Sequence, residues 1–187
     1  MDFEYLFKMS WKHYINGIVS LILFVLVGFL LCITIVLIPT VVGGWMRGTL
    51  AYVREHKKPK LQELWNFEDY FQTLILLVFG GLLMAIGYML LIIPGLVLNV
   101  FWLYSLLFVV DKKMVFTDAM IASKEAVTKG GFFQHLVILL IVLFLNSVSS
   151  AMGGVGSILT TPFSLVLVTI AYLDVVESRR LVDNATP

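Results

Sequence analysis

Four polar side chains stand inside long apolar stretches of the sequence, where few other groups are available for chemistry. They are Arg47, Asn99, Asn146 and Asp174. An ionisable group within a membrane span is costly and usually faces the interior of a helix bundle, where it finds a partner. Arg47 comes soon after Pro39, about 12 Å along a helix. We therefore expect Arg47 to point toward helices from the last third of the chain and to pair with Asn146 or Asp174. Helix carbonyls and snorkelling toward the cytoplasm are the alternatives.

The acidic and nucleophilic residues do not form a recognisable catalytic set. Glu68-Asp69 suits the positive start of a helix, and Asp174 and Glu177 share a helix face near a pair of arginines. Ser149-Ser150 has no histidine or acid on its side of the predicted membrane to activate a hydroxyl. The sequence contains no GxSxG, HExxH, P-loop or GxGxxG motif. We therefore expect no enzyme activity, no catalytic residues and no cofactor.

Three histidines lie near one predicted membrane boundary: His13, His56 and His135. Imidazoles at one depth are able to share a metal ion. Polar aromatic side chains also favour the membrane interface without binding anything, and this is the interpretation we prefer. The sequence therefore predicts no metal site.

The composition indicates a membrane protein. Of 187 residues, 60% are apolar and 13% are charged, and the mean hydropathy is +0.98, whereas soluble domains average about 45–50% apolar and about 25% charged residues. This excludes a soluble enzyme and a disordered chain. The net charge of +1 provides no concentrated basic face for nucleic acid. A single cysteine, Cys32, excludes an intramolecular disulfide and a cysteine metal cluster.

Three uncharged runs, 13–46, 70–110 and 130–173, organise the chain. As straight helices they would be about 50, 60 and 66 Å long, whereas the core of a bilayer is about 30 Å thick. Each run must therefore cross, turn and return. Turn signals stand at Pro39, at Pro94-Gly95 and from Gly153 to Pro162.

The sequence thus predicts one all-α membrane domain over 1–187, a polytopic helical bundle with six spans arranged as three helical hairpins. The hairpins cover about 13–56, 69–111 and 131–178. The spans are expected at about 13–38, 41–56, 69–92, 95–111, 131–152 and 157–178.

The charges predict how this bundle is oriented. All thirteen Lys and Arg fall on one side of the predicted threading, and the three opposite turns contain none. Basic loops stay in the cytoplasm. We therefore expect both termini to be cytoplasmic and the protein to lie in the plasma (inner) membrane of a cell.

Two segments that link the hairpins are predicted to be cytoplasmic interfacial helices. The first, about 59–68, has an apolar stripe at i, i+3, i+4 spacing, formed by Leu61, Leu64 and Trp65. The second, about 114–129, begins with Thr117 as a cap and ends at Gly130-Gly131. Its charges make it too polar to be a seventh span. A docking site or a gate is the alternative role for this segment.

Small residues at four-residue spacing predict close helix packing at three places: Gly44-xxx-Gly48, Gly81-xxx-Ala85 and Ser150-xxx-Gly154. A substrate path lined by glycines is the alternative interpretation.

Several stretches also match a pattern known from other membrane proteins. The longest runs from Asp111 through an Ala-Ser helix to Lys129-Gly130, and shorter ones are Gly44-Trp-Met-Arg47, Ile93-Pro94-Gly95, Gly153–Gly156, Pro162 and Ala171-Tyr172. In these stretches the chain resembles uncharacterised bacterial membrane families: DUF975, DUF4013, the YciC-like proteins and the membrane domain fused to glycerophosphodiester phosphodiesterases. The resemblance implies a six-helix, lipid-associated membrane module. It carries over no catalytic residues, because the phosphodiesterase chemistry belongs to a separate soluble domain.

We therefore expect a non-enzymatic integral membrane protein that acts on or within the bilayer, in a lipid-associated or assembly role. The alternative is a small transporter or channel. Arg47, Asn99 and Asn146 are few for a polar path through one subunit, so a pore would form between subunits or would carry an apolar or lipid substrate. The expected partners are membrane lipids and not nucleic acid. A homo-oligomer and a soluble partner on the cytoplasmic face stay open.

Overall fold

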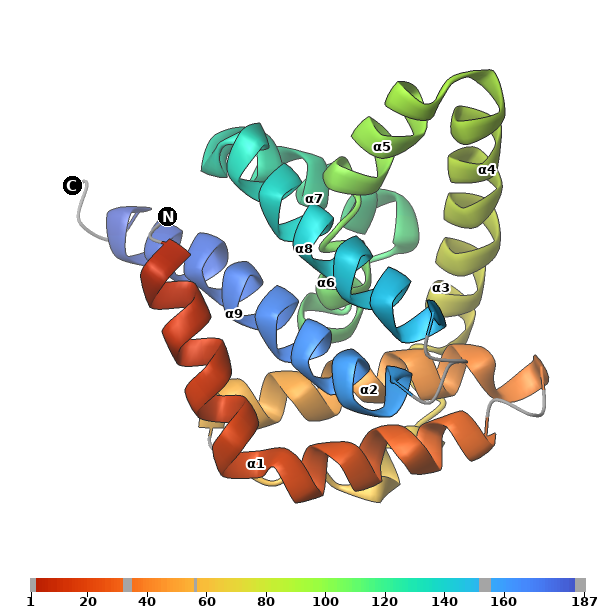
Figure 1. Cartoon of the computed structure of the whole chain (residues 1–187). Helices are drawn as coiled ribbons and strands as arrows, with labels where there is room; N and C mark the ends of the chain where they lie inside the picture. The colour runs from red at the N-terminus through yellow and green to blue at the C-terminus, as the bar shows by residue number, and fades with distance from the viewer. Residues whose placement is uncertain (1–2, 32–34, 56, 152–155, 184–187) are drawn as a thin grey trace.

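The computed structural model describes residues 3–31, 35–55, 57–151 and 156–183, and within these ranges the chain is helical and contains no strand. The all-α prediction is confirmed. Figure 1 shows the elements in order along the chain. Their bounds are α1 Phe3–Leu31, η1 Ile35–Leu37, α2 Ile38–Glu55, η2 Leu61–Trp65, α3 Tyr70–Ile75, η3 Leu76–Gly80, α4 Gly81–Leu90, α5 Ile92–Phe101, α6 Ser105–Lys112, α7 Phe116–Gly130, α8 Phe132–Ala151 and α9 Ser157–Asp183.

Within the described residues, five helical stretches are long and apolar enough to cross a bilayer. They are Glu4–Gly28, Tyr70–Leu90, Ile92–Lys112, Phe132–Ala151 and Ser157–Glu177. These correspond to the first, third, fourth, fifth and sixth predicted spans. The second of them runs without a break through α3, the π-helical turn η3 and α4. The helices are therefore compatible with a membrane protein, as the composition indicates.

The remaining predicted span, 41–56, is occupied by α2, which is not among these five. Helix α2 is amphipathic: Val41, Trp45 and Leu50 are buried in the fold, while Arg47 and Arg54 bind acidic partners. The hydroxyl of Tyr70 donates a hydrogen bond of 3.2 Å to the carbonyl oxygen of Val36. This bond joins the turn before α2 to the start of α3, two places that a six-span threading puts on opposite sides of the membrane.

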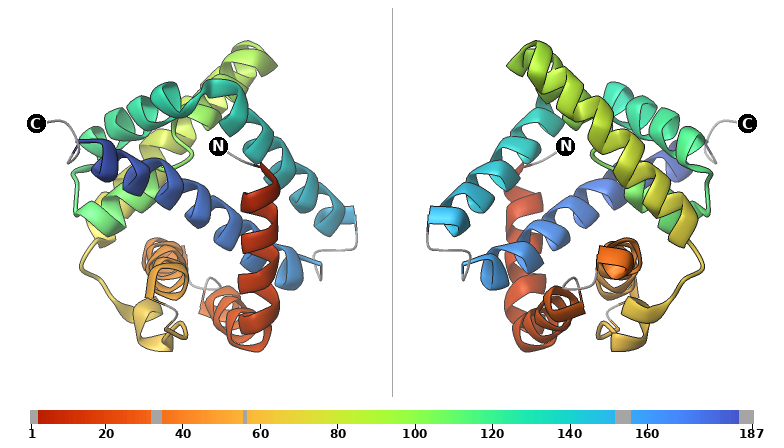
Figure 2. Two further views of the ribbon diagram at one scale, coloured as in Figure 1. Left: turned by 90° about the vertical axis from the view of Figure 1, so that its left-hand side faces the viewer. Right: turned by 90° about the vertical axis from the view of Figure 1, so that its right-hand side faces the viewer.

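The first two helices form a layer of their own. Figures 1 and 2 show that α1 bends strongly between its two halves, and that its second half lies beside α2 below α9. The run from α3 to α4 rises away from this layer. Helix α9, which is the most buried of the five apolar stretches, crosses between the layer and α8. The consecutive pairs α1–α2, α4–α5 and α8–α9 are each in contact, while the α1–α2 pair forms a layer of its own below α9.

The predicted turn signals have different outcomes. Pro39 and Pro94 lie in the first turns of α2 and α5, where a missing amide donor removes no helical hydrogen bond. The chain reverses before Pro94, at Leu91, whose backbone is extended. Pro162 does not break the third run, because it lies inside α9 near the start of that helix. The signal Gly153-Gly154 falls outside the described residues.

Close packing on α2 is confirmed at Gly44 and Gly48. A side chain at Gly44 would clash with the backbone of Glu63, and one at Gly48 would clash with the ring of Phe24. Gly81 does not have this role, because no atom lies within 4 Å of the place where its side chain would be. Gly154 of the third predicted pair is outside the described residues.

The two linkers also differ from expectation. The first forms the short 3-10 helix η2, in which Leu64 is buried while Leu61 and Trp65 are exposed. The second is the predicted helix α7, which ends at Gly130 and is followed by Gly131 with a positive φ of 96°. Its start is not capped by Thr117.

The start of α7 is bound by another helix instead. The side-chain oxygen of Gln72, in α3, accepts a hydrogen bond of 3.0 Å from the backbone N–H of Phe116, the first residue of α7. The first bond within this part of the helix runs from Ala119 to Val115. The amide of Phe116 therefore depends on Gln72 for its partner.

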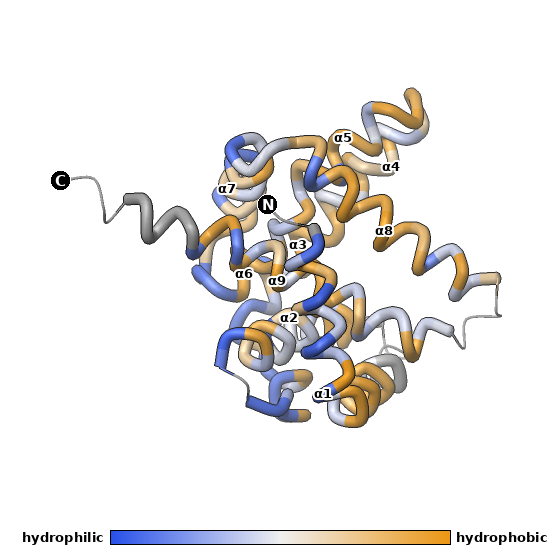
Figure 3. The backbone as a smooth tube through the Cα atoms, turned by 60° about the vertical axis from the view of Figure 1, so that its left-hand side comes forward, coloured by the Kyte–Doolittle hydropathy of each residue, from blue (hydrophilic) through white to orange (hydrophobic). Residues whose placement is uncertain are grey.

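Hydrophilic and apolar segments lie on different sides of the molecule. Figure 3 shows the hydrophilic stretches after α2, at the end of α6 and in α7 on one side, while the apolar parts of α8 and of the α4–α5 pair extend to the other. This separation agrees with the one-sided distribution of charge along the sequence.

Candidate functional site: two ion-pair clusters on α2

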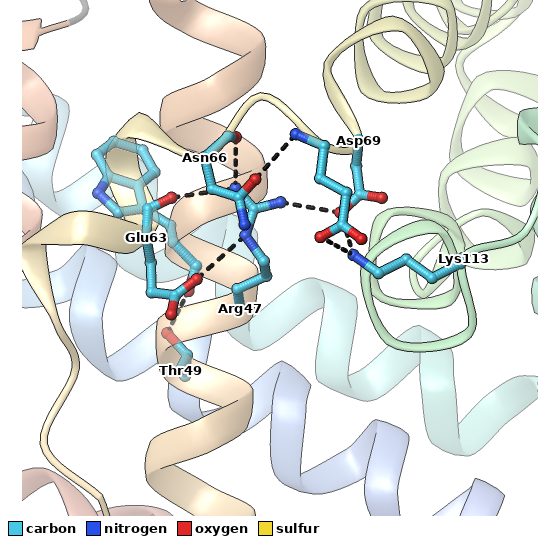
Figure 4. Close-up of polar contacts among 8 residues, drawn as sticks. Arg47, Thr49, Glu63, Asn66, Asp69 and Lys113 are labelled. Atoms are coloured by element: carbon cyan, nitrogen blue, oxygen red, sulfur yellow. Dashed lines mark hydrogen bonds and ion pairs between the residues drawn. The ribbon is translucent and has the colours of Figure 1, made fainter.

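Arg47 forms the centre of the first cluster, the Arg47 cluster, which Figure 4 shows. Its Nη1 lies 2.9 Å from Oδ2 of Asp69. Its Nη2 donates to the carbonyl oxygens of Glu63 at 3.0 Å and Asn66 at 2.9 Å. Its Nε is 3.4 Å from a carboxylate oxygen of Glu63, outside hydrogen-bond geometry. The side chain is only 10% exposed, so the guanidinium is enclosed by acceptors from one segment, 63–69.

Lys113 closes this cluster from the end of α6. Its Nζ lies 2.9 Å from Oδ2 of Asp69, whose side chain is 7% exposed, and 2.9 Å from Oε2 of Glu68. Burial lowers the pKa of Lys113, but the hydrogen bonds to Asp69 and Glu68 outweigh this effect and raise its pKa above the ordinary value. The hydrogen bond from Lys113 lowers the pKa of Glu68. One buried carboxylate thus holds two cations from different elements.

The prediction that Arg47 pairs with Asn146 or Asp174 is wrong. Helix α2 receives its acceptors from the linker that follows it, because η2 folds back against α2 over the bare backbone of Gly44. Gly44 precedes Arg47 by three positions, so both lie on the same face of the helix. The acid-rich segment Glu63–Asp69, which lies in the linker between α2 and α3, was the signal for this pairing.

Arg54 forms a second cluster, the Arg54 cluster, two turns further along α2. Its Nη1 and Nη2 bind the two carboxylate oxygens of Asp111 at 2.7 and 3.2 Å, a bidentate arrangement. Its Nε lies 3.2 Å from Glu177 in α9. The hydroxyl of Tyr172 donates to Asp111 at 2.8 Å. This cluster ties α2 to α6 and α9, and sequence analysis did not identify it.

The other polar candidates lie apart from these clusters. The amide of Asn99 donates to the hydroxyl of Tyr88 at 3.0 Å and joins α5 to α4. Asn146 is exposed on α8, and its carbonyl accepts a bond from Ser150. Asp174 is half-buried in α9. The contacts of the described residues do not bring the four candidates together.

The described histidines pack against tyrosines. The Nδ1 of His135 donates to the carbonyl of Gly131 at 2.8 Å, and its ring meets the edge of Tyr104. The ring of His13 lies 5.7 Å from that of Tyr52. His56 is outside the described residues. These contacts join α1 to α2 at Tyr52 and α8 to Tyr104.

Both clusters are suited to holding helices together. A guanidinium whose donors already face carboxylates and carbonyls has no free face for a substrate, and a bidentate arginine–carboxylate pair fixes geometry. The clusters connect the α1–α2 layer to α3, α6 and α9.

A comparison of the chain with protein-family models, with characterised proteins and with solved structures finds no match.

Proposed function

We propose that the chain is a non-enzymatic integral membrane protein that acts on or within the bilayer, in a lipid-associated or assembly role. The extent of outward apolar surface carries this proposal. Only 22% of the residues are buried inside the fold in each of the stretches Tyr70–Leu90 and Phe132–Ala151. Phe71, Met89 and Phe144 are among their exposed side chains. Surfaces of this size and composition require lipid or another apolar cover.

We also propose that both termini lie on the cytoplasmic side of a bacterial plasma membrane. The one-sided charges support this orientation. Both termini lie on the same side of the membrane if the α1–α2 hairpin crosses the membrane twice, as six spans require. The same is true if the hairpin enters the membrane and returns on the same side. The bend of α1 and the bond from Tyr70 to Val36 favour the second arrangement.

The transporter alternative has less support from the contacts. The donors of Arg47 face Asp69 and two carbonyls, and Asn99 is bound to Tyr88. The Nη groups of Arg47 and the Nδ2 of Asn99 are therefore already used in bonds within the fold. A pathway would have to form between subunits or carry an apolar substrate.

Purified full-length protein in liposomes tests the proposal. We expect efflux of an entrapped dye and of potassium ions to equal that of empty liposomes, and native mass spectrometry to show bound lipid after detergent exchange. The Arg47→Ala variant should leave efflux unchanged. Efflux above that of empty liposomes that changes in the Arg47→Ala variant would establish the transporter instead.

A further inference from the structure

A polar cavity of about 440 Å³ lies between α1, the end of α2 and the linker that follows it. It is separate from both ion-pair clusters. One wall is a stripe on α1 at i, i+4, i+8 spacing, formed by Lys12, Asn16 and Ser20. The linker contributes Lys58 to the opposite wall. The side chains of two lysines, an asparagine and a serine therefore line one cavity that is open to its surroundings.

The positive charge of this cavity has no counterion within the described residues. Lys12 and Lys58 make no ion pair there, and no acidic side chain lines the cavity. The nearest acids along the chain are bound elsewhere, because Glu4 pairs with Lys8 and Glu55 pairs with Lys57. An anion that enters would gain charge-assisted hydrogen bonds from both walls.

The floor of the cavity is rigid. The hydroxyl of Tyr52 donates to the carbonyl of His13 at 2.6 Å, and its ring meets that of His13 edge-on. Gly17 leaves the space that the tyrosine occupies, since a side chain there would clash with the Tyr52 hydroxyl. These contacts fix α1 against α2 at the base of the cavity.

An exposed apolar stripe runs beside the polar one along α1. It consists of Trp11, Ile15 and Val19, each one position before a residue of the polar stripe. Neighbouring positions are about 100° apart around a helix. A ligand with an anionic head and an apolar tail is therefore able to contact both stripes at once. A free anion has no use for the apolar stripe.

We propose that this cavity binds a phosphate group, and that its natural source is the headgroup of an anionic phospholipid whose chains lie along the apolar stripe. Phosphate offers the negative charge and the multiple acceptors that Lys12, Lys58, Asn16 and Ser20 require. The volume lies within the range of small-molecule sites, about 300–1,000 Å³. Basic pockets between helices on the cytoplasmic side suit lipid headgroups. The choice of a lipid source rests on the proposed function.

Native mass spectrometry of the full chain in neutral detergent tests this site. The probes are phosphatidylglycerol, phosphatidylcholine, glycerol phosphate and inorganic phosphate. We expect phosphatidylglycerol to bind more tightly than phosphatidylcholine, and the double variant Lys12→Gln/Lys58→Gln to weaken it about tenfold or more, the effect of losing a charge-assisted contact. The Lys12→Arg/Lys58→Arg variant should restore binding.

The control is Lys57→Gln/Lys60→Gln, which also removes two positive charges but takes both from linker residues that do not line the cavity. An equal loss in this control, or unchanged binding in Lys12→Gln/Lys58→Gln, overturns the site. If neutral lipid still binds in that case, the proposed function stands and only the site fails. Glycerol phosphate or inorganic phosphate binding as tightly as phosphatidylglycerol would keep the phosphate site but overturn its lipid source.

Discussion

At the scale of single residues, the two arginines of α2 differ in how completely their charge is enclosed. Arg47 is 10% exposed and serves three acceptors from one segment, while Arg54 is 31% exposed and binds two carboxylates. Removing one member of a buried pair leaves the other uncompensated, which is more costly than the loss of an exposed pair. The two positions therefore form a matched pair for mutation.

We expect Arg47→Leu to destabilise the protein by about 3 kcal/mol and Arg54→Leu by less. The physical reason is that Arg47→Leu removes the donor to the carbonyl of Asn66 and one of the two donors to the carbonyl of Glu63, in addition to the ion pair with Asp69. Thermal unfolding in one detergent measures both variants. Arg47→Lys is the control. It keeps the positive charge but loses the planar guanidinium, so its melting temperature should lie between those of the unmodified protein and the Arg47→Leu variant. Equal melting temperatures of the two leucine variants would contradict this prediction.

Lys113 should react slowly with amine-acylating reagents. Its raised pKa leaves less neutral amine at a given pH, and acylation needs the neutral form. Peptide mass spectrometry at pH 8.5 gives its rate relative to exposed Lys60 in the same sample. Glu68→Gln removes one of the two acceptors and should speed the reaction of Lys113 while leaving that of Lys60 unchanged. If Glu68→Gln leaves the acylation rate of Lys113 unchanged, the ion pair between Lys113 and Glu68 does not form.

At the scale of elements, local periodicity and apolar length predicted the helices well. Four of the six predicted spans and helix α7 appear within a few residues of the expected places, because length, hydropathy and the Gly130-Gly131 end are properties of neighbouring residues. The first apolar stretch, Glu4–Gly28, lies about ten residues before the span predicted at about 13–38. The linker after α2 and the partner of Arg47 were not predictable in this way. Both depend on η2 folding back onto Gly44 of α2. The periodicity of the sequence does not determine how these two segments are aligned with each other.

The start of α7 should loosen when Gln72 cannot accept a hydrogen bond. Gln72→Leu leaves the amide of Phe116 without its partner, at a cost of about 1 kcal/mol, similar to the loss of a helix cap. Hydrogen exchange should therefore increase at the first turn of α7 and not at its last turn. Gln72→Glu keeps an acceptor and serves as the control. Unchanged exchange at Phe116 in Gln72→Leu would mean that α3 does not hold this helix.

At the scale of the whole molecule, the path of the α1–α2 hairpin decides how the chain is threaded. Cysteine labelling in a Cys32→Ser background distinguishes the two arrangements. The turn residue Thr40 is unsuitable because it is buried, whereas Val36 is 63% exposed and Leu91, at the α4–α5 turn, is 68% exposed. Lys58 marks the charged linker.

We expect an impermeant thiol reagent to label Leu91→Cys in intact cells and to label Val36→Cys and Lys58→Cys only after permeabilisation. Val36 should be protected because its carbonyl binds Tyr70, directly after the charged linker, and basic linkers stay in the cytoplasm. Labelling of both Leu91→Cys and Val36→Cys from outside would establish six crossings and would require the bond between Tyr70 and Val36 to break in the membrane. Labelling of Lys58→Cys in intact cells would reverse the orientation. A cysteine near the amino terminus should be protected if the hairpin crosses twice or not at all, so Val36→Cys distinguishes these two arrangements. A crossing by α1 alone, with α2 on the cytoplasmic side, would instead expose the amino-terminal cysteine to the reagent.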